Sequence, residues 1–419
     1  MNVFYNLGIA LMDMGARVAS LKSEKVQKMI EGQKATINYL HSVIDLSSSY
    51  VWIHVASLGE FEQGRPLIEK IKSEDPSRKI LLTFFSPSGY EVRKDYDGVD
   101  AVCYLPFDKP NNVKQFLDSV NLEMAIFVKY EFWGNYLQEL NRRNIPTYIV
   151  SAIFRPTQSF FKWWGGMFRD LLKCFDHLYV QDKQSHQLLA SIGVENVTIA
   201  GDTRFDRVTE IMNRTVEIPL IESFKEGARS TIIVGSSWSV DEDVYIDWIN
   251  KQKDVKVIIA PHQFDASRLT RMQQRINNSM LWSKYQSIAV PSSDNAMSRL
   301  QKVKCLIIDG FGLLSSIYRY GDIAYVGGGF GAGIHNINEA AVYDMPVVFG
   351  PKYHKFKEAV DLVSLGGAFV VNNKKECGQV LEKLTTDAMA LEKASKIAGN
   401  YIRENIGATN RIYDSIFRR

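Results

Sequence analysis

Short apolar, β-branched runs alternate with helix-periodic segments along most of the chain. Between residues 51 and 182, the runs with the character of buried strands are VWIHVA, ILLTFF, AVCYLPF, MAIFV, TYIVSA and HLYVQD. The segments between them, such as EFEQGRPLIEKIKS and EFWGNYLQELNRRN, repeat apolar residues at helical spacing. Continuous apolar strands separated by helices predict a parallel sheet covered on both faces.

A second series of the same kind follows a less regular segment from about Asp206 to Arg229. Its strand-like runs are STIIVGSS, VKVIIAP, KCLIID, DIAYVGGG, PVVFG and GAFVV. The fold class expected is therefore α/β, with doubly wound parallel sheets in domains 31–212 and 213–390. Residues 391–419 have helical periodicity with one polar side, which suits a return to the first domain. Because ligands sit beyond the carboxyl ends of parallel strands, we expect the site in a cleft between the two sheets.

The first 28 residues have the polar spacing of an amphipathic helix. Phe4, Leu7, Leu11, Met14, Val18 and Leu21 form a wide apolar arc. Asp13 and Arg17 would each cost about 2.5 to 3.5 kcal/mol at the centre of a bilayer, and the apolar run is too short to span it. Two interpretations remain for residues 1–30: a helix in the membrane interface, with Lys22, Lys25 and Lys28 toward anionic head groups, or a helix packed on the first domain.

Composition and charge narrow the class of partner. The 419 residues are 46% hydrophobic and carry a formal net charge of only +3, which gives no reason to expect nucleic acid. The cysteines are Cys103, Cys174, Cys305 and Cys377. They are far apart and form no CxxC pair, so they indicate core thiols of a reducing compartment, with no zinc site or disulfide framework.

The stretch YVGGGFGAGIHNINEAAVYDMPVVFGP, Tyr325 to Pro351, runs from a strand into a glycine-rich turn and a helix. Such a turn lets the backbone approach a phosphate, and the helix offers free N–H groups. Gly327, Gly329 and Ala332 match a loose GxGxxA. No acid follows at the ribose-binding distance, so a nicotinamide or flavin site is disfavoured.

Charged residues directly after strands are the candidates in the first half. Glu60, in SLGEFEQG, is either a helix cap or a base whose pKa a cleft raises toward neutrality. Under the first interpretation Glu62 is the acid expected to face water. Lys129 and Glu131, after MAIFV, form either an ion pair or part of a site.

Two further first-half turns carry groups suited to an oxygen-rich ligand. SPSG presents the hydroxyls of Ser86 and Ser88. In GDTRFDRV, Arg204 either pairs with Asp202 or Asp206 or holds an anion.

Four turns of the second half also follow strands. The triplet Asp241 to Asp243 is the acidic first turn of a helix in preference to a metal site. Pro261 and His262 end one strand, and the turn Gly310 to Leu313 follows another. Asn336 and Glu339 lie three apart in a first helical turn, as either a capping box or ligands.

The ordered motifs ASLGE, SPSG, YEFW, GDTRFD, GSS, APH, DGFG and GGGF…GIHNINEAA…PVVFGP…FKEA resemble those of the 3-deoxy-D-manno-octulosonic acid (Kdo) transferases of lipopolysaccharide assembly. The resemblance runs to about Val371. It implies a GT-B fold, two Rossmann-like domains facing across a cleft, and inverting transfer of Kdo from CMP-Kdo to a hydroxyl of the tetra-acylated lipid A precursor (lipid IVA). It implies no cofactor and no metal.

The resemblance also implies roles for individual residues. Glu60 would be the general base, and Glu131 and Arg204 would support the transition state. The residues implied for CMP binding are Pro261, His262, Phe311, Gly312, Leu313, Asn336, Ile337, Asn338 and Glu339. Three positions depart from the family pattern: no arginine precedes His262, Leu313 stands where the family has a glutamate, and Lys129 replaces an acid.

A lipid acceptor favours the interfacial interpretation of the first helix, and so a place on the cytoplasmic side of the inner membrane, peripheral or monotopic. In FRPTQSFFKWWGGMFRDLLK, residues Arg155, Lys162 and Arg169 are expected at acceptor phosphates or head groups, whereas Trp163, Trp164 and Phe168 suit either that surface or the core. Two competing functions remain: a GT-B enzyme for another nucleotide sugar, and a non-catalytic membrane-bound nucleotide-binding protein.

Overall fold

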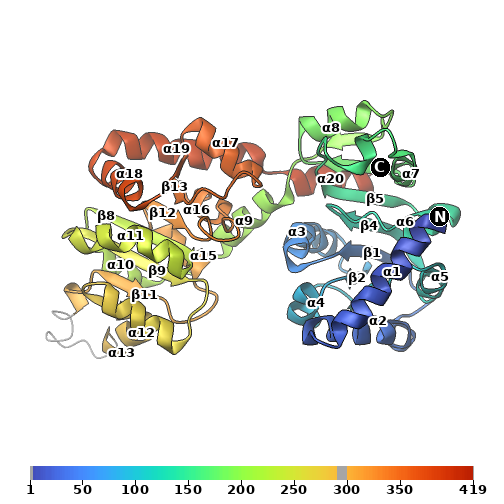
Figure 1. Ribbon diagram of the computed structural model, residues 1–419, viewed down its shortest axis with the longest axis horizontal. Coiled ribbons are helices and arrows are strands. Elements are labelled where there is room, and N and C mark those ends of the chain that lie inside the picture. Colours follow the sequence, from blue (N-terminus) through green and yellow to red (C-terminus); the bar gives the residue numbers. More distant parts are fainter. Residues whose placement is uncertain (1–2, 290–299, 419) are drawn as a thin grey trace. The chain divides into compact units, whose positions relative to one another are not determined.

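A computed structural model describes residues 3–289 and 300–418 (Figure 1). The chain forms two compact units, and its path between them is discontinuous. The first unit comprises Met1–Arg207 and Ile406–Arg419, and the second comprises Val208–Asn405. The second unit is thus inserted, in sequence, into the first.

The first unit is built on a seven-stranded parallel sheet. Its strand order is β3-β2-β1-β4-β5-β6-β7. The strands are β1 (Tyr50–Val55), β2 (Lys79–Phe84), β3 (Ala101–Tyr104), β4 (Leu122–Val128), β5 (Thr147–Ala152), β6 (His177–Val180) and β7 (Val197–Ile199). The sequence did not predict β7, a three-residue edge strand too short and too exposed to stand out from its loop.

Both faces of this sheet are covered, as its apolar strands predict. Along β1, Trp52 enters one core with helices α5 and α6, whereas Val51 and Ile53 enter a second core with α3 and α20. The helices are α1 (Val3–Ser20), α2 (Glu24–Val43), α3 (Leu58–Glu74), α4 (Pro87–Arg93), α5 (Pro110–Asp118), α6 (Gly134–Arg142), the 3₁₀ helix η1 (Ser159–Phe161), α7 (Gly166–Leu172), α8 (Lys183–Ala190), α9 (Thr203–Arg214) and α20 (Ala408–Phe417).

The second unit repeats the architecture with strand order β10-β11-β9-β8-β12-β13-β14, also all parallel. Its strands are β8 (Ser230–Ser237), β9 (Val255–Pro261), β10 (Ser279–Leu281), β11 (Cys305–Ile307), β12 (Ile323–Val326), β13 (Val347–Phe349) and β14 (Ala368–Val370). The prediction of two doubly wound parallel sheets is confirmed. Here the short edge strand β10 is the one that the sequence did not predict.

The helices of the second unit surround this sheet. They are α10 (Pro219–Lys225), α11 (Ser239–Lys251), α12 (Ala266–Arg275), α13 (Trp282–Ala289), α15 (Leu314–Ile317), the 3₁₀ helix η2 (Tyr318–Tyr320), α16 (Asn338–Ala341), α17 (Lys357–Leu365), α18 (Lys374–Thr386) and α19 (Ala388–Asn405). The segment expected to be irregular, Asp206 to Arg229, contains most of α9 and all of α10. The four cysteines are buried and unpaired, as expected of core thiols.

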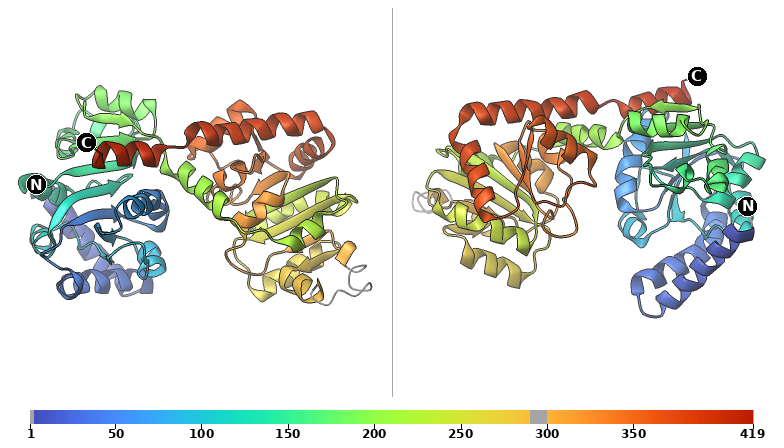
Figure 2. Two further views of the ribbon diagram at one scale, coloured as in Figure 1. Left: turned by 180° about the vertical axis from the view of Figure 1, so that it is seen from behind. Right: turned by 45° about the horizontal axis from the view of Figure 1, so that its top comes forward.

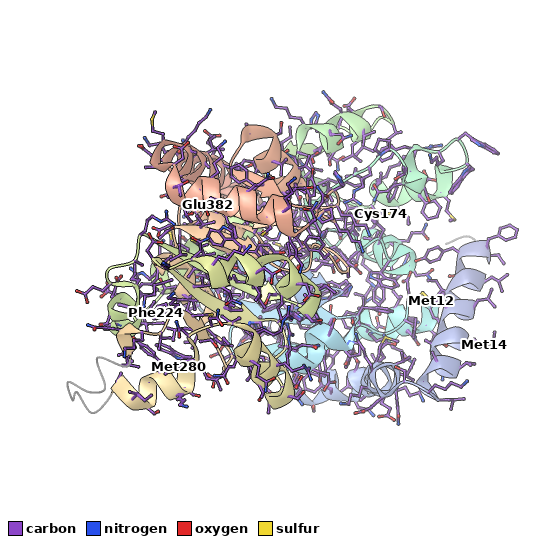
Figure 3. The ribbon with its side chains drawn as sticks, turned by 60° about the vertical axis from the view of Figure 1, so that its left-hand side comes forward. Met12, Met14, Cys174, Phe224, Met280 and Glu382 are labelled. Carbon is purple, nitrogen blue, oxygen red and sulfur yellow. The ribbon has the colours of Figure 1, made fainter. Side chains whose placement is uncertain are left out.

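The first two helices form a hairpin on the first unit (Figure 2). Helix α1 packs through its polar residues: Tyr5 donates to Asp108 at 2.6 Å, and Asn135 donates to Asn6 at 2.8 Å. The apolar arc is exposed instead, with Phe4 79% accessible, and Figure 3 shows Met12 and Met14 on the surface of this helix. The helix therefore packs on the first unit through its polar side and exposes its apolar side.

Candidate active site

The carboxyl end of β1 leads directly into α3, whose first turn carries Glu60. The Glu60 carboxylate accepts a hydrogen bond from the Ala56 backbone N–H at 2.6 Å. Burial and, next, the nearby Glu131 carboxylate raise the pKa of Glu60 to about 7. Glu60 therefore stabilises the turn between β1 and α3 by its bond to Ala56, and its pKa is close to neutral pH, as a general base requires. Glu62, expected to face water, is half-buried and pairs with Arg93 at 3.0 Å.

A buried hydrogen-bonded chain holds Glu131 beside this turn. Trp133 Nε1 donates to Glu131 Oε2 at 2.6 Å, and His54 Nε2 lies 3.2 Å from the same oxygen. Further in, His54 Nδ1 lies 2.8 Å from Thr83 Oγ1, which accepts from Trp52 Nε1. If Thr83 donates its proton to Nδ1, the neutral histidine donates from Nε2 to Glu131, and every member of the chain is satisfied. The sequence did not indicate this chain, because its members come from β1, β2 and the loop after β4.

The loop after β4 has an unusual backbone. Lys129 adopts a left-handed φ of 69°, and its cation helps to lower the pKa of Glu60, opposing burial and Glu131. Non-glycine residues in this region cost free energy and cluster at functional sites. Ser86, at the neighbouring strand end, donates its backbone N–H to Ala56 O at 2.7 Å. The Ser86 turn and the Glu60 turn therefore lie together at one sheet edge.

Arg204 stands at the start of α9, where its first-predicted partner, Asp202, is buried. The Arg204 guanidinium lies 2.7 Å from Asp202 Oδ2. Burial would raise the pKa of Asp202, but Arg204 outweighs it and holds that pKa below its ordinary value. Asp206, the alternative partner, instead accepts from the Gly407 and Thr409 backbone N–H groups. Tyr130 connects the two parts of this region electrostatically: burial raises its pKa, Arg155 and Arg204 lower it, and Glu60 raises it.

In the second unit, three of the implicated turns meet at the carboxyl edge of neighbouring strands. His262 donates its backbone N–H to Ser237 O at 2.9 Å, which joins the turn containing Pro261 to the end of β8. Phe264 contacts Phe311 with ring centroids 4.4 Å apart. Next to it, Gly312 has a φ of 84° and Leu313 caps α15. The Leu313 side chain makes no capping hydrogen bond, so the backbone of this turn is what it presents at the strand end.

Three rings gather where these turns meet the glycine-rich loop. The His262 ring lies 4.4 Å from Trp238 and 4.5 Å from His335 between centroids, and Trp238 Nε1 donates to His335 Nε2 at 3.1 Å. Burial, then Arg268, lowers the pKa of His262, and burial, then His262, lowers that of His335. Both imidazoles are therefore neutral at pH 7. The sequence had not singled out Trp238 or His335, whose only signal was a position after a strand or a glycine turn.

The buried carboxylate of Asp241 holds the glycine-rich loop in place. Asp241 accepts from the backbone N–H groups of Trp238 at 2.8 Å and Gly328 at 3.0 Å. It therefore lies in the first turn of α11, as predicted, and ties that turn to the loop. A Cβ on Gly329 would come within 2.6 Å of the Gly350 backbone, so this glycine is required by packing between the two loops.

The Asn336 to Glu339 turn does not form the capping box considered above. Helix α16 begins at Asn338 with Ile337 as its N-cap, and Asn336 Nδ2 donates to Glu339 Oε1 at 3.1 Å. Asn338 is fully buried, and neither polar atom of its side chain has a hydrogen-bond partner among the described residues. The two polar side chains at the surface of this turn are thus preorganised by each other.

Two further regions differ from what the sequence suggested: Arg268 beside the Pro261–His262 turn, and the aromatic segment before α7. Arg268, on α12, places its guanidinium against Ser237 O at 3.0 Å and Glu242 at 2.7 Å. It brings a cation to the Pro261–His262 turn, which lacks the arginine of the family pattern. Trp163 is 92% exposed, whereas Phe168 packs against Phe160, so the aromatic segment before α7 divides between surface and core.

Comparison with known proteins identifies the relatives. Residues 17–207 match the family model described as 3-deoxy-D-manno-octulosonic-acid transferase (kdotransferase). The 3-deoxy-D-manno-octulosonic acid transferases of Aquifex aeolicus and Haemophilus influenzae are each 26% identical, over 84% and 87% of this chain and 92% and 86% of theirs. A bifunctional glycosyltransferase/methyltransferase of Fusobacterium nucleatum is also 26% identical over 81% of this chain, which spans only 53% of that protein.

Solved structures show the fold. The UDP-GlcNAc 2-epimerase from Neisseria meningitidis bound to UDP-GlcNAc superposes with a TM-score of 0.59 over 88% of this chain and all of that one, at 13% identity. A putative UDP-N-acetylglucosamine 2-epimerase from Listeria monocytogenes gives 0.56 over 88% of this chain and 97% of that one, at 11% identity. The GT-B type of fold expected from the resemblance is confirmed. Residues 17–207 form a domain of the Kdo transferase family, and the chain as a whole is similar to the 3-deoxy-D-manno-octulosonic acid transferases of Aquifex aeolicus and Haemophilus influenzae.

Proposed function

We propose that the chain is an inverting glycosyltransferase that moves Kdo from CMP-Kdo to a hydroxyl of the tetra-acylated lipid A precursor, lipid IVA, in lipopolysaccharide core biosynthesis. The observation that carries the mechanism is the Glu60 carboxylate, whose pKa is raised to about 7. A base with this pKa is about half ionised at pH 7 and still accepts a proton strongly.

The proposed step is a direct displacement. Glu60 takes the proton of the acceptor hydroxyl, the acceptor oxygen bonds to the anomeric carbon of Kdo, and the bond from that carbon to the CMP phosphate oxygen breaks. CMP leaves with the electron pair of that bond. The pKa of Glu60 supports its role as the base, and no second carboxylic acid is needed, because the phosphate is already a good leaving group when its charge is met by amides and cations.

Glu131 and Arg204 support the transition state in this proposal. The Glu131 carboxylate is fixed by Trp133 and His54 and holds the pKa of Glu60 up by its charge. Arg204 is held by Asp202 close enough to Tyr130 to influence its pKa. A fixed carboxylate and a fixed guanidinium cost little reorganisation as charge develops.

The second unit would bind CMP at the turns that meet at its sheet edge. Neutral His262 and the glycine-rich loop offer hydrogen-bond donors to a phosphate, and the linked Asn336 and Glu339 offer polar groups for the ribose or base. Pro261, Phe311, Gly312, Leu313, Ile337 and Asn338 would shape this site. Arg268 supports a positional replacement of the missing arginine, since its guanidinium donates to Gln263 O beside the same turn, while Glu242 balances its charge.

The protein would work at the cytoplasmic side of the inner membrane, held there through α1. Its apolar arc is exposed while its polar side packs on the first unit, which supports contact with lipid. Fully burying a Leu or Phe side chain contributes about 1.5 to 3 kcal/mol, so a few partly inserted residues suffice for reversible binding. No helix within residues 3–289 and 300–418 is both long and apolar enough to span a bilayer.

The exposed Trp163 and the half-exposed Trp164 support a second contact with the same surface, since indoles prefer the membrane interface. Both exposed apolar segments belong to the first unit.

The test is an assay of purified protein in detergent with CMP-Kdo and lipid IVA, following CMP release and lipid mass. We expect a gain of one or more Kdo units, and a rate lowered about 10²- to 10⁴-fold by Glu60→Gln but little changed by Glu62→Gln on the same helix. Equal rates for wild type and Glu60→Gln would remove Glu60 as the base.

Nucleotide binding separates the competing functions. Thermal stabilisation by CMP but not UDP is expected. Stabilisation by UDP alone would favour a transferase or epimerase for another nucleotide sugar, and CMP binding without turnover would favour a non-catalytic protein or a different acceptor.

A further inference from the structure

The hairpin of α1 and α2 encloses a small polar cavity that the proposed reaction does not use. Its volume is about 150 Å³, and it lies within the first unit between the two helices, the loop after β3 and helix α5. Its polar lining comes from Asp13, Arg17, Gln33, Lys34, Asn112 and Gln115. At about 30 Å³ per water molecule it has room for roughly five waters, or for one group of phosphate size.

The charge around this cavity is positive. Asp13 is its one lining carboxylate, and it accepts from Arg17 Nε at 3.0 Å and from Lys109 Nζ at 2.5 Å. Burial would raise the pKa of Asp13, but these two cations outweigh it and hold that pKa below its ordinary value. Lys34 has no ion-pair partner in the part of the chain that the structure describes. A second anion is therefore favoured in or beside the cavity.

A buried amide in the lining lacks a partner for its donor group. Gln33 is only 7% exposed, and its Nε2 makes no hydrogen bond to any described residue. Leaving such a donor unsatisfied costs about 1 to 3 kcal/mol. The group that the lining lacks is an acceptor.

We propose that this cavity binds a phosphate group, and that its source is the head group of a membrane phospholipid. Gln33 would donate from its amide, while Arg17 and Lys34 would supply charge-assisted hydrogen bonds. The lipid source rests on the membrane position proposed above. Val18 follows Arg17 within α1, and Leu21 comes just after the end of that helix; both belong to the exposed apolar arc. A head group bound here would leave its acyl chains beside that arc.

The experiment compares full-length wild type with Gln33→Leu, Lys34→Gln and Lys114→Gln. Lys114 is exposed on α5, which also borders the cavity, but it does not line the cavity, so Lys114→Gln removes the same charge without touching the site. Binding to vesicles of phosphatidylcholine with phosphatidylglycerol is measured by sedimentation. Stabilisation against heat is measured with inorganic phosphate against chloride at equal ionic strength.

We expect Gln33→Leu and Lys34→Gln to bind the vesicles about tenfold more weakly, the equivalent of 1.4 kcal/mol, and Lys114→Gln to bind nearly as wild type. Phosphate should stabilise wild type and Lys114→Gln but not Gln33→Leu. Gln33→Leu should also melt no lower than wild type without phosphate, because it removes an unsatisfied donor. A loss of binding without a loss of stability distinguishes a ligand site from a packing role.

Three results would overturn the proposal or part of it. Equal losses in Lys114→Gln and Lys34→Gln would mean nonspecific attraction to an anionic surface, and identical behaviour of Gln33→Leu and wild type in both assays would mean that no phosphate binds. Stabilisation by free phosphate that needs Gln33, with unchanged vesicle binding, would overturn the lipid source alone. Neither assay depends on Kdo transfer, so failure of the proposed enzyme activity is read separately.

Discussion

The position of the Glu131 carboxylate depends on residues that lie outside the sequence motifs. Its carboxylate is held through His54 by Thr83, and Thr83 also accepts from Trp52. His54 and Thr83 are fully buried. These hydrogen bonds therefore fix the Glu131 side chain to residues of the sheet. They depend most on the Thr83 hydroxyl, because it bonds both His54 and Trp52.

We expect Thr83→Val, which keeps the shape and removes the hydroxyl, to lower the free energy of unfolding by about 2 to 4 kcal/mol. Both Trp52 Nε1 and His54 Nδ1 lose their partner, at about 1 to 3 kcal/mol for each buried group. Urea unfolding measures the change. Thr198→Val is the matched control, since Thr198 bonds the exposed His177, and it should change stability by less than about 0.5 kcal/mol. Equal effects would argue against the buried chain.

The raised pKa of Glu60 predicts a particular pH dependence of stability. The folded state binds the Glu60 proton more tightly than the unfolded state does, so this residue favours folding at low pH. That contribution is lost as pH rises from the ordinary glutamate value to about 7. Glu60→Gln should therefore gain stability relative to wild type between pH 5 and pH 8.

The same group sets the expected activity profile. In wild type, kcat/KM for the proposed transfer should rise with pH through about 7 as Glu60 ionises. Unfolding curves at several pH values and rate profiles provide two independent measurements. Parallel stability profiles of wild type and Glu60→Gln would show that the pKa of Glu60 is ordinary.

Residue-scale prediction from the sequence succeeded where the partners lie within a few residues of each other in one turn. Asp241 was expected in an acidic first turn and lies there, and Arg204 does pair with Asp202. Its failures concern partners contributed by other strands. Spacing along the chain contains no information about which side chains of neighbouring strands face one another, so the contacts of His54 and of His335 were out of reach.

At the scale of elements, α1 is the informative case. Periodicity showed that one side is apolar, but the same pattern fits a helix packed through that side or through the opposite one. The choice was made by specific polar contacts, such as Tyr5 with Asp108 and Lys109 with Asp13. Such contacts lie about a hundred residues apart and leave no local signal.

Substitutions on the two sides of α1 should have opposite consequences. We expect Leu11→Glu to leave the free energy of unfolding within about 0.5 kcal/mol of wild type, because Leu11 is exposed, and to weaken vesicle binding. Ile9→Glu should destabilise the protein by more than about 2 kcal/mol, since Ile9 is 8% exposed and a buried carboxylate would lack a partner. Chemical unfolding and vesicle sedimentation test both. The membrane role of α1 fails if Leu11→Glu binds vesicles as wild type does.

Otherwise, the helices and strands that the sequence did not predict are mostly the short ones. The long apolar strands were recognised, while β7 and β10, with three residues each at sheet edges, were not. Helices α9 and α10 were taken for an irregular stretch, because α10 is short and starts at a proline between charged segments. Short elements owe their form to their neighbours more than to their own pattern.

At the scale of the whole chain, the last helix belongs to the first unit. Ile412 and Ile416 of α20 enter the core beneath the sheet of that unit, and Tyr179 donates to Ser415 at 2.8 Å. Asp206 accepts from the Gly407 and Thr409 backbone N–H groups and from the Thr409 hydroxyl. One carboxylate thus joins the point where the chain leaves the unit to the point where it returns.

We expect a chain that stops after Asn405 to lose the stability of the first unit while the second unit keeps its own. Removal of Ile412 and Ile416 opens a large gap in the core, and each such deletion in a core costs about 2 to 5 kcal/mol. Hydrogen exchange read peptide by peptide measures the two units separately. Unchanged protection of β1 and β4 in the shortened chain would contradict this.

The return of the chain at Ile406 also has a consequence for biosynthesis. The ribosome makes α1 long before α20, yet the unit that carries α1 gains the core residues of α20 only when that last helix of the unit emerges. The inserted second unit is complete before then. Throughout translation, therefore, the nascent chain displays an apolar helix on an unfinished domain, and this interval is when a chaperone or the membrane itself would first engage the protein.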